Sequence, residues 1–163
     1  MNHFLYTVLA VGVIALGIVY GLPYLRQPDI DRLVDSALTA SSDADQLEAA
    51  RQLSQLGEPA CDGLRQIIAE SDNPDVVATA LLAVTRMMDY QSMDQILMKL
   101  DDPSLTVRSA AAKSVAKLLG RDHHYPIRGS AAERTLVKEQ IVKDWEAYNG
   151  SELFEFNKKR FNN

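Results

Sequence analysis

The chain has 163 residues, which is enough for one ordinary domain and a short appendage. Apolar residues make up 47% and charged residues 24%, a composition typical of a folded chain and not of a disordered one. The formal net charge of −5 at pH 7 argues against a broad nucleic-acid-binding surface, because such surfaces depend on clustered Lys and Arg. We therefore expect no nucleic-acid partner.

The first segment, residues 1–25, is dominated by an uncharged apolar run from Phe4 to Leu22. About 19 residues at a rise of about 1.5 Å each span roughly 29 Å, which matches the hydrocarbon core of a bilayer. A cleaved signal peptide is the alternative. Lys and Arg are absent ahead of the run, however, the run is longer than the usual signal core, and no clear A-x-A site follows it. The sequence thus predicts a retained, single-pass transmembrane helix.

Two features of this segment bear on its orientation and assembly. Arg26 and Arg32 both follow the apolar run, so the positive-inside rule favours a cytoplasmic C-terminal domain, although two arginines leave export open. Gly17 and Gly21 form a G-x-x-x-G spacing, which would allow a homodimer through the membrane helix. Unpaired glycine facing lipid is the alternative interpretation of the same spacing.

Residues 26–42 are predicted to form a linker helix, because apolar residues follow Pro28-Asp29 at helical spacing. Helix openings then recur along the chain at Ser41-Ser42-Asp43, Asn73-Pro74 and Asp102-Pro103. The last two place a side-chain acceptor at the cap and a proline at the first helical position. They lie about 29 residues apart, and self-similarity at such a period is typical of a stacked helical array.

An apolar helix with small residues inside it follows each opening, and the small residues allow a second helix to pack closely. The apolar positions of these three first helices are Leu47, Ala49, Ala50, Leu53 and Leu56; Val76, Ala80, Leu81, Val84 and Met87; and Val107, Ala110, Ala111, Val115 and Leu118. The second helices are predicted from Pro59 to Glu70 and from Ser92 to Leu100. Two helical pairs are thereby complete.

The residues from Asp102 to Gly120 follow the pattern D-P-x-x-x-V-R-x-x-A-A and end in L-G, and residues 49–64 carry a similar pattern of Ala, Leu and Gly. In these motifs the chain resembles the HEAT-repeat family, in the short bacterial form called PBS-lyase-like. The resemblance implies an all-α fold in which a short α-solenoid of about three helical pairs follows the transmembrane helix. The family's arginine is present at Arg108 but not in the second repeat, where Val77 and Ala78 occupy the region.

The C-terminal part begins with a polar, proline-broken loop after Gly120. Ser130 and Glu133 then form a capping box, which predicts a further helix. This helix is expected to pair with the helix that follows Asp102-Pro103. The apolar stripe of this helix consists of Val137, Ile141, Trp145 and Tyr148. The repeat domain is therefore predicted to cover residues 43–149. Residues 150–163 are predicted to form a tail of mixed aromatic and basic residues, which either frays or touches anionic lipid.

No catalytic motif is present, and the candidate sites each have a plain structural alternative. Cys61, the single cysteine, is expected to be a buried thiol and not a reactive one. His123 and His124 are adjacent in a loop, and adjacent residues rarely direct both imidazoles onto one metal ion. We therefore expect a surface loop and no metal or cofactor, with a metal or pH-sensing site as the alternative. Trp145 and Tyr148 are expected in the core, with a partner-binding role as the alternative.

The sequence predicts a non-enzymatic, membrane-anchored adaptor that binds a protein partner at the bilayer. Second helices line the concave side of the solenoids that this chain resembles, so the resemblance implies protein-binding residues on them: Arg65, Gln66, Glu70, Asp94, Gln95 and Lys99. The alternative is a PBS-lyase-like enzyme or enzyme subunit that handles a tetrapyrrole chromophore, because some relatives of this kind do so. The resemblance here extends to the repeat and not to a chromophore site.

Overall fold

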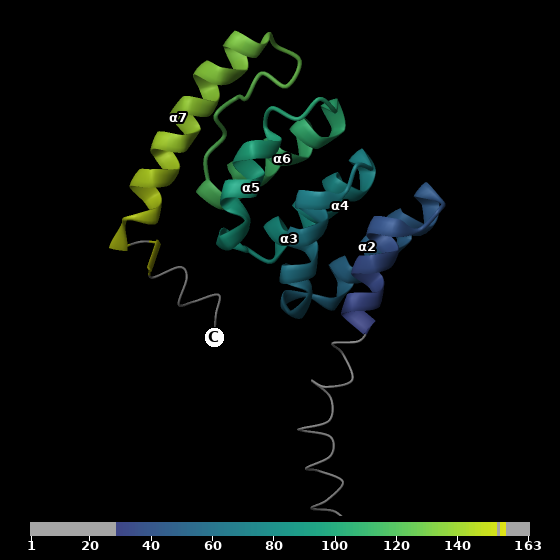
Figure 1. Cartoon of the computed structure of the whole chain (residues 1–163). Coiled ribbons are helices and arrows are strands. Elements are labelled where there is room, and N and C mark those ends of the chain that lie inside the picture. The colour runs from purple at the N-terminus through teal and green to yellow at the C-terminus, as the bar shows by residue number, and fades with distance from the viewer. Residues whose placement is uncertain (1–28, 153, 156–163) are drawn as a thin grey trace, which may run out of the picture.

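The computed structural model of the chain describes residues 29–152, 154 and 155, and every regular element in this part is helical (Figure 1). A helix covers residues 29–39. It is followed by α2 (Asp43–Leu56), the 3-10 turn η1 (Glu58–Ala60), α3 (Cys61–Glu70), α4 (Pro74–Arg86), η2 (Tyr90–Ser92), α5 (Met93–Lys99), α6 (Leu105–Leu119) and α7 (Ala131–Asn149). The predicted all-α solenoid of paired helices is confirmed.

The predicted membrane segment from Phe4 to Leu22, with Gly17 and Gly21, lies outside the described residues, as does most of the basic-aromatic tail. None of the helices that the structure describes is both long and apolar enough to cross a bilayer.

The first helices of the three repeats are α2, α4 and α6, which stack side by side (Figure 1). They begin at Asp43, Pro74 and Leu105, so successive starts lie 31 residues apart. The middle helix, α4, buries eight of its 13 residues because it packs against neighbours on both sides. Its small residues, such as Ala80 at 0% exposure, allow this close approach.

Each second helix begins with a 3-10 turn. The turns η1 and η2 precede α3 and α5, so the predicted starts at Pro59 and Ser92 fall within the turns and not at the α-helices. Gly57 ends α2 at a φ of 76° and Gly120 ends α6 at a φ of 65°. Because a side chain strains a backbone with positive φ, glycine fits both positions, and this accounts for the L-G that closes the first-helix motif.

The helix over residues 29–39, assigned to a linker in the sequence analysis, contributes Ile30, Val34 and Ala37 to the same core as the repeats. It packs against α3 at Gly63, where an added Cβ would lie 2.5 Å from Val34 Cγ2. The absence of a side chain at Gly63 therefore allows the two helices to approach each other closely.

The start of α6 differs from the prediction. Pro103 precedes the helix, and Asp102 Oδ1 accepts a hydrogen bond from the backbone N–H of Ser104 at 2.8 Å in a turn. The predicted cap at Asn73 is confirmed, since its side chain accepts from the N–H groups of Asp75 and Val76. The two similar dipeptides thus open their helices by different geometries.

An irregular loop with a turn near residue 128 leads from α6 into α7 (Figure 1). The capping box predicted at Ser130 and Glu133 is present. Ile141 and Trp145 of α7 are buried, and Val137 and Tyr148 pack partly buried against the core, so the predicted stripe faces the solenoid.

Candidate protein-interaction cleft

A cleft of about 530 Å³ opens on the second-helix side of the solenoid, between the start of α3, the connection from α4 to α5 and the C-terminal end of α7. We call it the acidic cleft, because four carboxylates and one arginine line it. Its lining residues are Glu58, Pro59, Cys61, Asp62, Arg65, Met87, Met88, Asp89, Tyr90, Gln91, Asp94, Trp145, Asn149 and Phe154.

Arg65 and Asp89 fix the centre of this cleft. The guanidinium of Arg65 forms ion pairs with Asp89 and with Asp62. Asp89 also accepts hydrogen bonds from Ser92 Oγ at 2.5 Å and from the backbone N–H of Gln91 at 3.2 Å. Burial lowers the pKa of Arg65, but the carboxylates of Asp89 and Asp62 together raise it by more than burial lowers it. The pKa of Arg65 therefore lies above its ordinary value.

The ion pair also holds the two helical pairs in register. Arg65 comes from α3 and Asp89 from the turn that caps η2, and the Asp89 side chain is only 9% exposed. A carboxylate this buried needs polar partners, and here arginine and two hydrogen-bond donors surround it. The cleft therefore has a preorganised polar floor.

Three aromatic rings, those of Tyr90, Trp145 and Phe154, line the cleft, and Tyr148 packs against them. Tyr90 stacks on Trp145 at a centroid distance of 6.3 Å, and Phe154 meets the rings of Tyr90, Trp145 and Tyr148 edge-on at 5.2–5.7 Å. Offset and edge-to-face arrangements of this kind are the favourable geometries for aromatic pairs. Burial, with the hydrogen bond to Tyr148, raises the pKa of Tyr90, which keeps the phenol protonated.

Cys61 lies at the start of α3, at the edge of the cleft, and is buried as predicted. Burial raises the pKa of its thiol to about 11, and the nearby charge of Asp89 adds to the effect. Its Sγ lies 3.8 Å from Met87 Sδ. The thiol is therefore protonated at neutral pH and packs as an apolar group.

The predicted protein-binding residues are distributed over the second-helix side, and two of them, Arg65 and Asp94, line the acidic cleft. Gln66 lines a separate pocket beside the helix over residues 29–39 and hydrogen-bonds Glu70, which is exposed. On α5, Lys99 lies 3.9 Å from Asp102.

Gln95, also on α5, differs from the other five predicted residues. Its Oε1 is buried with no hydrogen-bond partner among the described residues.

Sequence reasoning missed Asp89, Tyr90 and Phe154 as members of the site. Asp89 and Tyr90 belong to the short connection between two helices, and Phe154 lies in a segment predicted to fray. One signal was available for the first pair: Asp89 begins a short Asp-Tyr-Gln-Ser turn, and aspartate favours capping positions. No local pattern indicates that Phe154 returns to Tyr90.

The two loop histidines differ in burial and in partner. His123 has a side chain that is only 4% exposed, and its Nε2 lies 2.9 Å from Asp144 Oδ2 of α7. His124 is exposed and pairs with Asp122 at 3.3 Å. The prediction of a surface loop therefore holds for His124 and fails for His123, which tethers the loop to α7. Among residues 29–152, 154 and 155 no group of His, Cys, Asp and Glu could hold a metal ion.

Comparison with known proteins gives one match. Residues 30–116 match the sequence model of HEAT repeats, which covers more than half of the chain and includes the helix over residues 29–39. No curated protein and no solved structure matches the chain. HEAT repeats stack into solenoids whose surfaces commonly bind other proteins, in agreement with the geometry described above. The chain therefore belongs to the HEAT-repeat family.

Proposed function

We propose that this chain is a non-enzymatic adaptor, anchored in a membrane through the segment from Phe4 to Leu22, which holds a protein partner in the acidic cleft. One observation carries the proposal: the cleft combines a wall of aromatic rings with a rim of carboxylates. Aromatic side chains dominate the energetics of protein interfaces, and the charges around them select the partner.

The chemistry of the cleft favours a basic segment with an apolar or aromatic residue at its centre. Glu58 and Asp94 are exposed on the rim, where they would attract Lys or Arg, whereas Asp62 is already paired with Arg65. The apolar residue of the partner would lie against Tyr90, which is half-buried, whereas Trp145 and Phe154 are buried behind it in the same wall. An interface of this size suits one helix or a short peptide.

Anchoring would keep the cleft close to the bilayer. Seven residues separate Leu22 from Ile30, so the first core helix lies at most roughly 29 Å along the chain from the end of the anchor. Tethering both partners to one membrane raises their effective concentration without any new contact. Arg26 and Arg32 favour the cytoplasmic side for the domain.

The anchor is tested by extraction. The full chain should stay in the membrane pellet after an alkaline carbonate wash and enter solution with detergent; release by carbonate would refute the anchor. A C-terminal epitope in intact cells should resist added protease and become sensitive after lysis. Cleavage once only an outer envelope is opened would place the domain outside the cytoplasm.

The cleft is tested by site-specific photo-cross-linking in intact membranes. A photoreactive residue at Gln91, which is exposed at the cleft, should give a discrete protein adduct. The same residue at Asp75, which is exposed at the start of α4, should not. The adduct at Gln91 should weaken when Asp94→Lys reverses a rim charge. Equal adducts at both positions, or no effect of Asp94→Lys, would contradict the proposal.

A further inference from the structure

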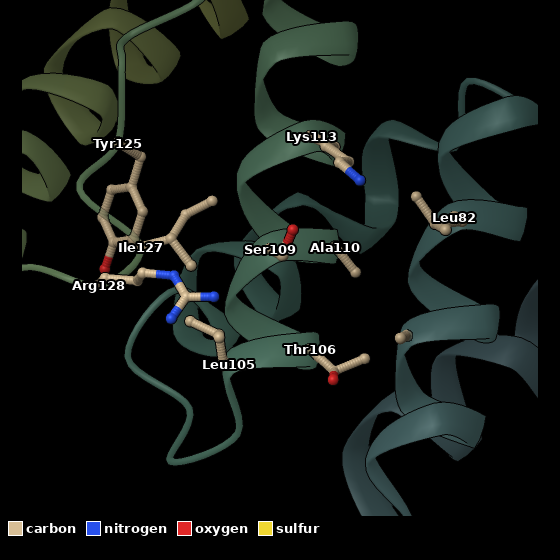
Figure 2. A pocket seen from close by; sticks show the side chains of 10 residues that line it. Leu82, Leu105, Thr106, Ser109, Ala110, Lys113, Tyr125, Ile127 and Arg128 are labelled. Carbon is tan, nitrogen blue, oxygen red and sulfur yellow. The ribbon is translucent and has the colours of Figure 1, made fainter.

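A second concave surface lies on the first-helix side of the molecule. It is a groove of about 670 Å³ with α6 as its floor, α4 on one side and the loop residues Tyr125 to Arg128 on the other (Figure 2). We call it the basic groove. It has no lining residue in common with the acidic cleft.

The loop side of the groove is held in place by three hydrogen bonds, of which the one from Tyr125 is buried. Arg108 Nε donates to the carbonyl oxygen of Ile127 at 3.0 Å, and Arg108 Nη1 donates to that of Asp102 at 2.7 Å. Tyr125, which is 8% exposed, donates its hydroxyl to the carbonyl oxygen of Leu100 at 2.7 Å. The groove is therefore preformed, and a ligand would not have to order it.

An apolar strip runs along the floor and both sides. Leu82 projects from α4 toward the groove and is 46% exposed, although α4 is otherwise the most buried helix. Leu105 and Ile127 are half-buried on the loop side. Exposed apolar surface next to a concave, polar-rimmed site is typical of a binding surface.

The charge of the groove is opposite to that of the chain. Lys113 and Arg128 are exposed at the groove, and neither forms an ion pair within the described part of the chain. No carboxylate is among its lining residues, although the net charge of the chain is −5. In contrast, Glu58, Asp62, Asp89 and Asp94 line the cleft. The two surfaces would therefore attract ligands of opposite sign.

We propose that the basic groove is a docking site for an acidic amphipathic segment of a second protein. An apolar side chain of that segment lies between Leu82 and Ile127, and carboxylates on its flanks reach Lys113 and Arg128. Two cations fall short of the clusters of about four to eight Lys and Arg that recognise anionic lipid, so the chemistry favours a protein segment over a membrane surface.

The test uses the full chain in nanodiscs of zwitterionic lipid and a fluorescent synthetic helix of about 15 residues, which gives about four turns. The helix carries leucines along one face and glutamates on both flanks, and matched versions replace every glutamate with glutamine or with lysine. Fluorescence anisotropy should show that the glutamate helix binds about tenfold more tightly than the glutamine helix, a difference that shrinks as salt screens the charges.

Variants locate the binding. Lys113→Glu with Arg128→Glu should weaken the glutamate helix about tenfold, whereas Lys117→Glu, an exposed charge one turn further along α6 and outside the groove, should change it less than about twofold. Leu82→Ser should weaken both the glutamate and the glutamine helix. The lysine helix should bind the double variant better than it binds the unaltered chain, which shows that the variant is folded.

Several results would overturn the proposal. Equal affinity for the glutamate and glutamine helices, or an equal loss with Lys117→Glu, would remove the charge argument. Binding of anionic vesicles that Lys113→Glu with Arg128→Glu abolishes, in the absence of helix binding, would assign the groove to the membrane. Self-association of the chain that Leu82→Ser abolishes, without helix binding, would assign it to a second copy.

Discussion

At the residue scale, Asn73 links two repeats through one side chain. Its Oδ1 accepts from the N–H groups of Asp75 and Val76, and its Nδ2 donates to Gln46 Oε1 at 3.1 Å. Removing both functions with Asn73→Ala should lower the free energy of unfolding by about 1–2 kcal/mol, since loss of a cap costs about that much. Urea unfolding followed by circular dichroism measures the change.

Ser104 provides the matched control for this prediction. It occupies the cap position of α6, but its side chain makes no capping hydrogen bond. Ser104→Ala should therefore change the free energy of unfolding by less than about 0.5 kcal/mol. If the two variants were equally destabilised, the side-chain bonds of Asn73 would not be the cause.

We expect Asp144 to make the attachment of α7 weaker at low pH. Its hydrogen bond with His123, then that with Gln140, and the charge of Arg121 hold the pKa of Asp144 below its ordinary value. A carboxyl group whose pKa is depressed by folding contributes stability at neutral pH and loses that contribution as the pH falls through its folded pKa. Asp144→Asn should therefore lower the free energy of unfolding at pH 7. Below about pH 4, the free energy of unfolding should fall by less in this variant than in the unaltered chain.

The comparison is a difference between chains, because many carboxyl groups titrate together in acid. Thermal unfolding of both chains is measured at pH 7 and at about pH 3, and the second value lies below the ordinary pKa of aspartate. Glu146→Gln is the control: Glu146 is exposed on the same helix and forms no ion pair within residues 29–152, 154 and 155. A flat difference between Asp144→Asn and the unaltered chain across this range would contradict the prediction.

Local signals at this scale predicted caps but not long-range partners. Asn73 and the Ser130–Glu133 box follow from residue types within four positions of one another, and both are present. Arg108 lies in a recognisable family motif, yet its bond to Ile127 joins the helix to a loop 19 residues away. The burial of His123 depends likewise on Asp144, which no local pattern identifies.

At the element scale, Gly63 determines how closely the helix over residues 29–39 packs on α3. In an isolated helix, glycine to alanine is favourable by about 1 kcal/mol. Here an added Cβ would lie 2.5 Å from Val34 Cγ2, and a β-branched side chain has little freedom to move away. Gly63→Ala should therefore destabilise the chain by about 1 kcal/mol, because overpacking outweighs helix propensity.

A double-mutant cycle separates the two effects. In a Val34→Ala background the contact is gone, so Gly63→Ala should become stabilising by about 0.5–1 kcal/mol, the ordinary helix propensity gain. The measurement is the free energy of unfolding of all four chains in urea. If Gly63→Ala had the same sign in both backgrounds, the close approach to Val34 would not be the reason for glycine here.

Helix periodicity predicted which elements form, while packing decided how they join. The apolar spacing in α2, α4 and α6 identifies their buried faces, because each face meets neighbouring repeats with the same pattern. The 3-10 turns before α3 and α5 and the start of α6 at Leu105 are set by connections that lack such periodicity. The core role of Ile30 and Val34 depends on their contact with Gly63, far along the chain.

At the scale of the whole molecule, the solenoid presents two concave surfaces of opposite charge. The acidic cleft is lined by rings brought together from residues 90, 145 and 154, so its aromatic wall exists only in the folded chain. The basic groove depends on Arg108, the motif arginine, which fixes the loop at Ile127. Under the two proposals made above, one repeat stack of this size joins a basic partner to an acidic one.

The stability of the stack should not be uniform along it. Only two of the 19 residues of α7 are buried, against eight of 13 in α4, so the C-terminal helix has the weaker attachment. Stability in repeat proteins is approximately a sum of nearest-neighbour terms, and a terminal helix has only one neighbouring layer. We expect α7 to detach from the stack before the central helices unfold.

Trp145, the single tryptophan, reports this detachment directly. Its fluorescence should change at a lower urea concentration than the circular dichroism signal of the remaining helices. Phe154→Ala removes an edge-on ring from Trp145 and should move the fluorescence transition lower while leaving the main circular dichroism transition in place. Leu81→Ala, in the centre of α4, should move both. Coincident transitions in the unaltered chain and in Phe154→Ala would instead mean that α7 unfolds with the repeats as one cooperative unit, and that the cleft opens only when the whole solenoid does.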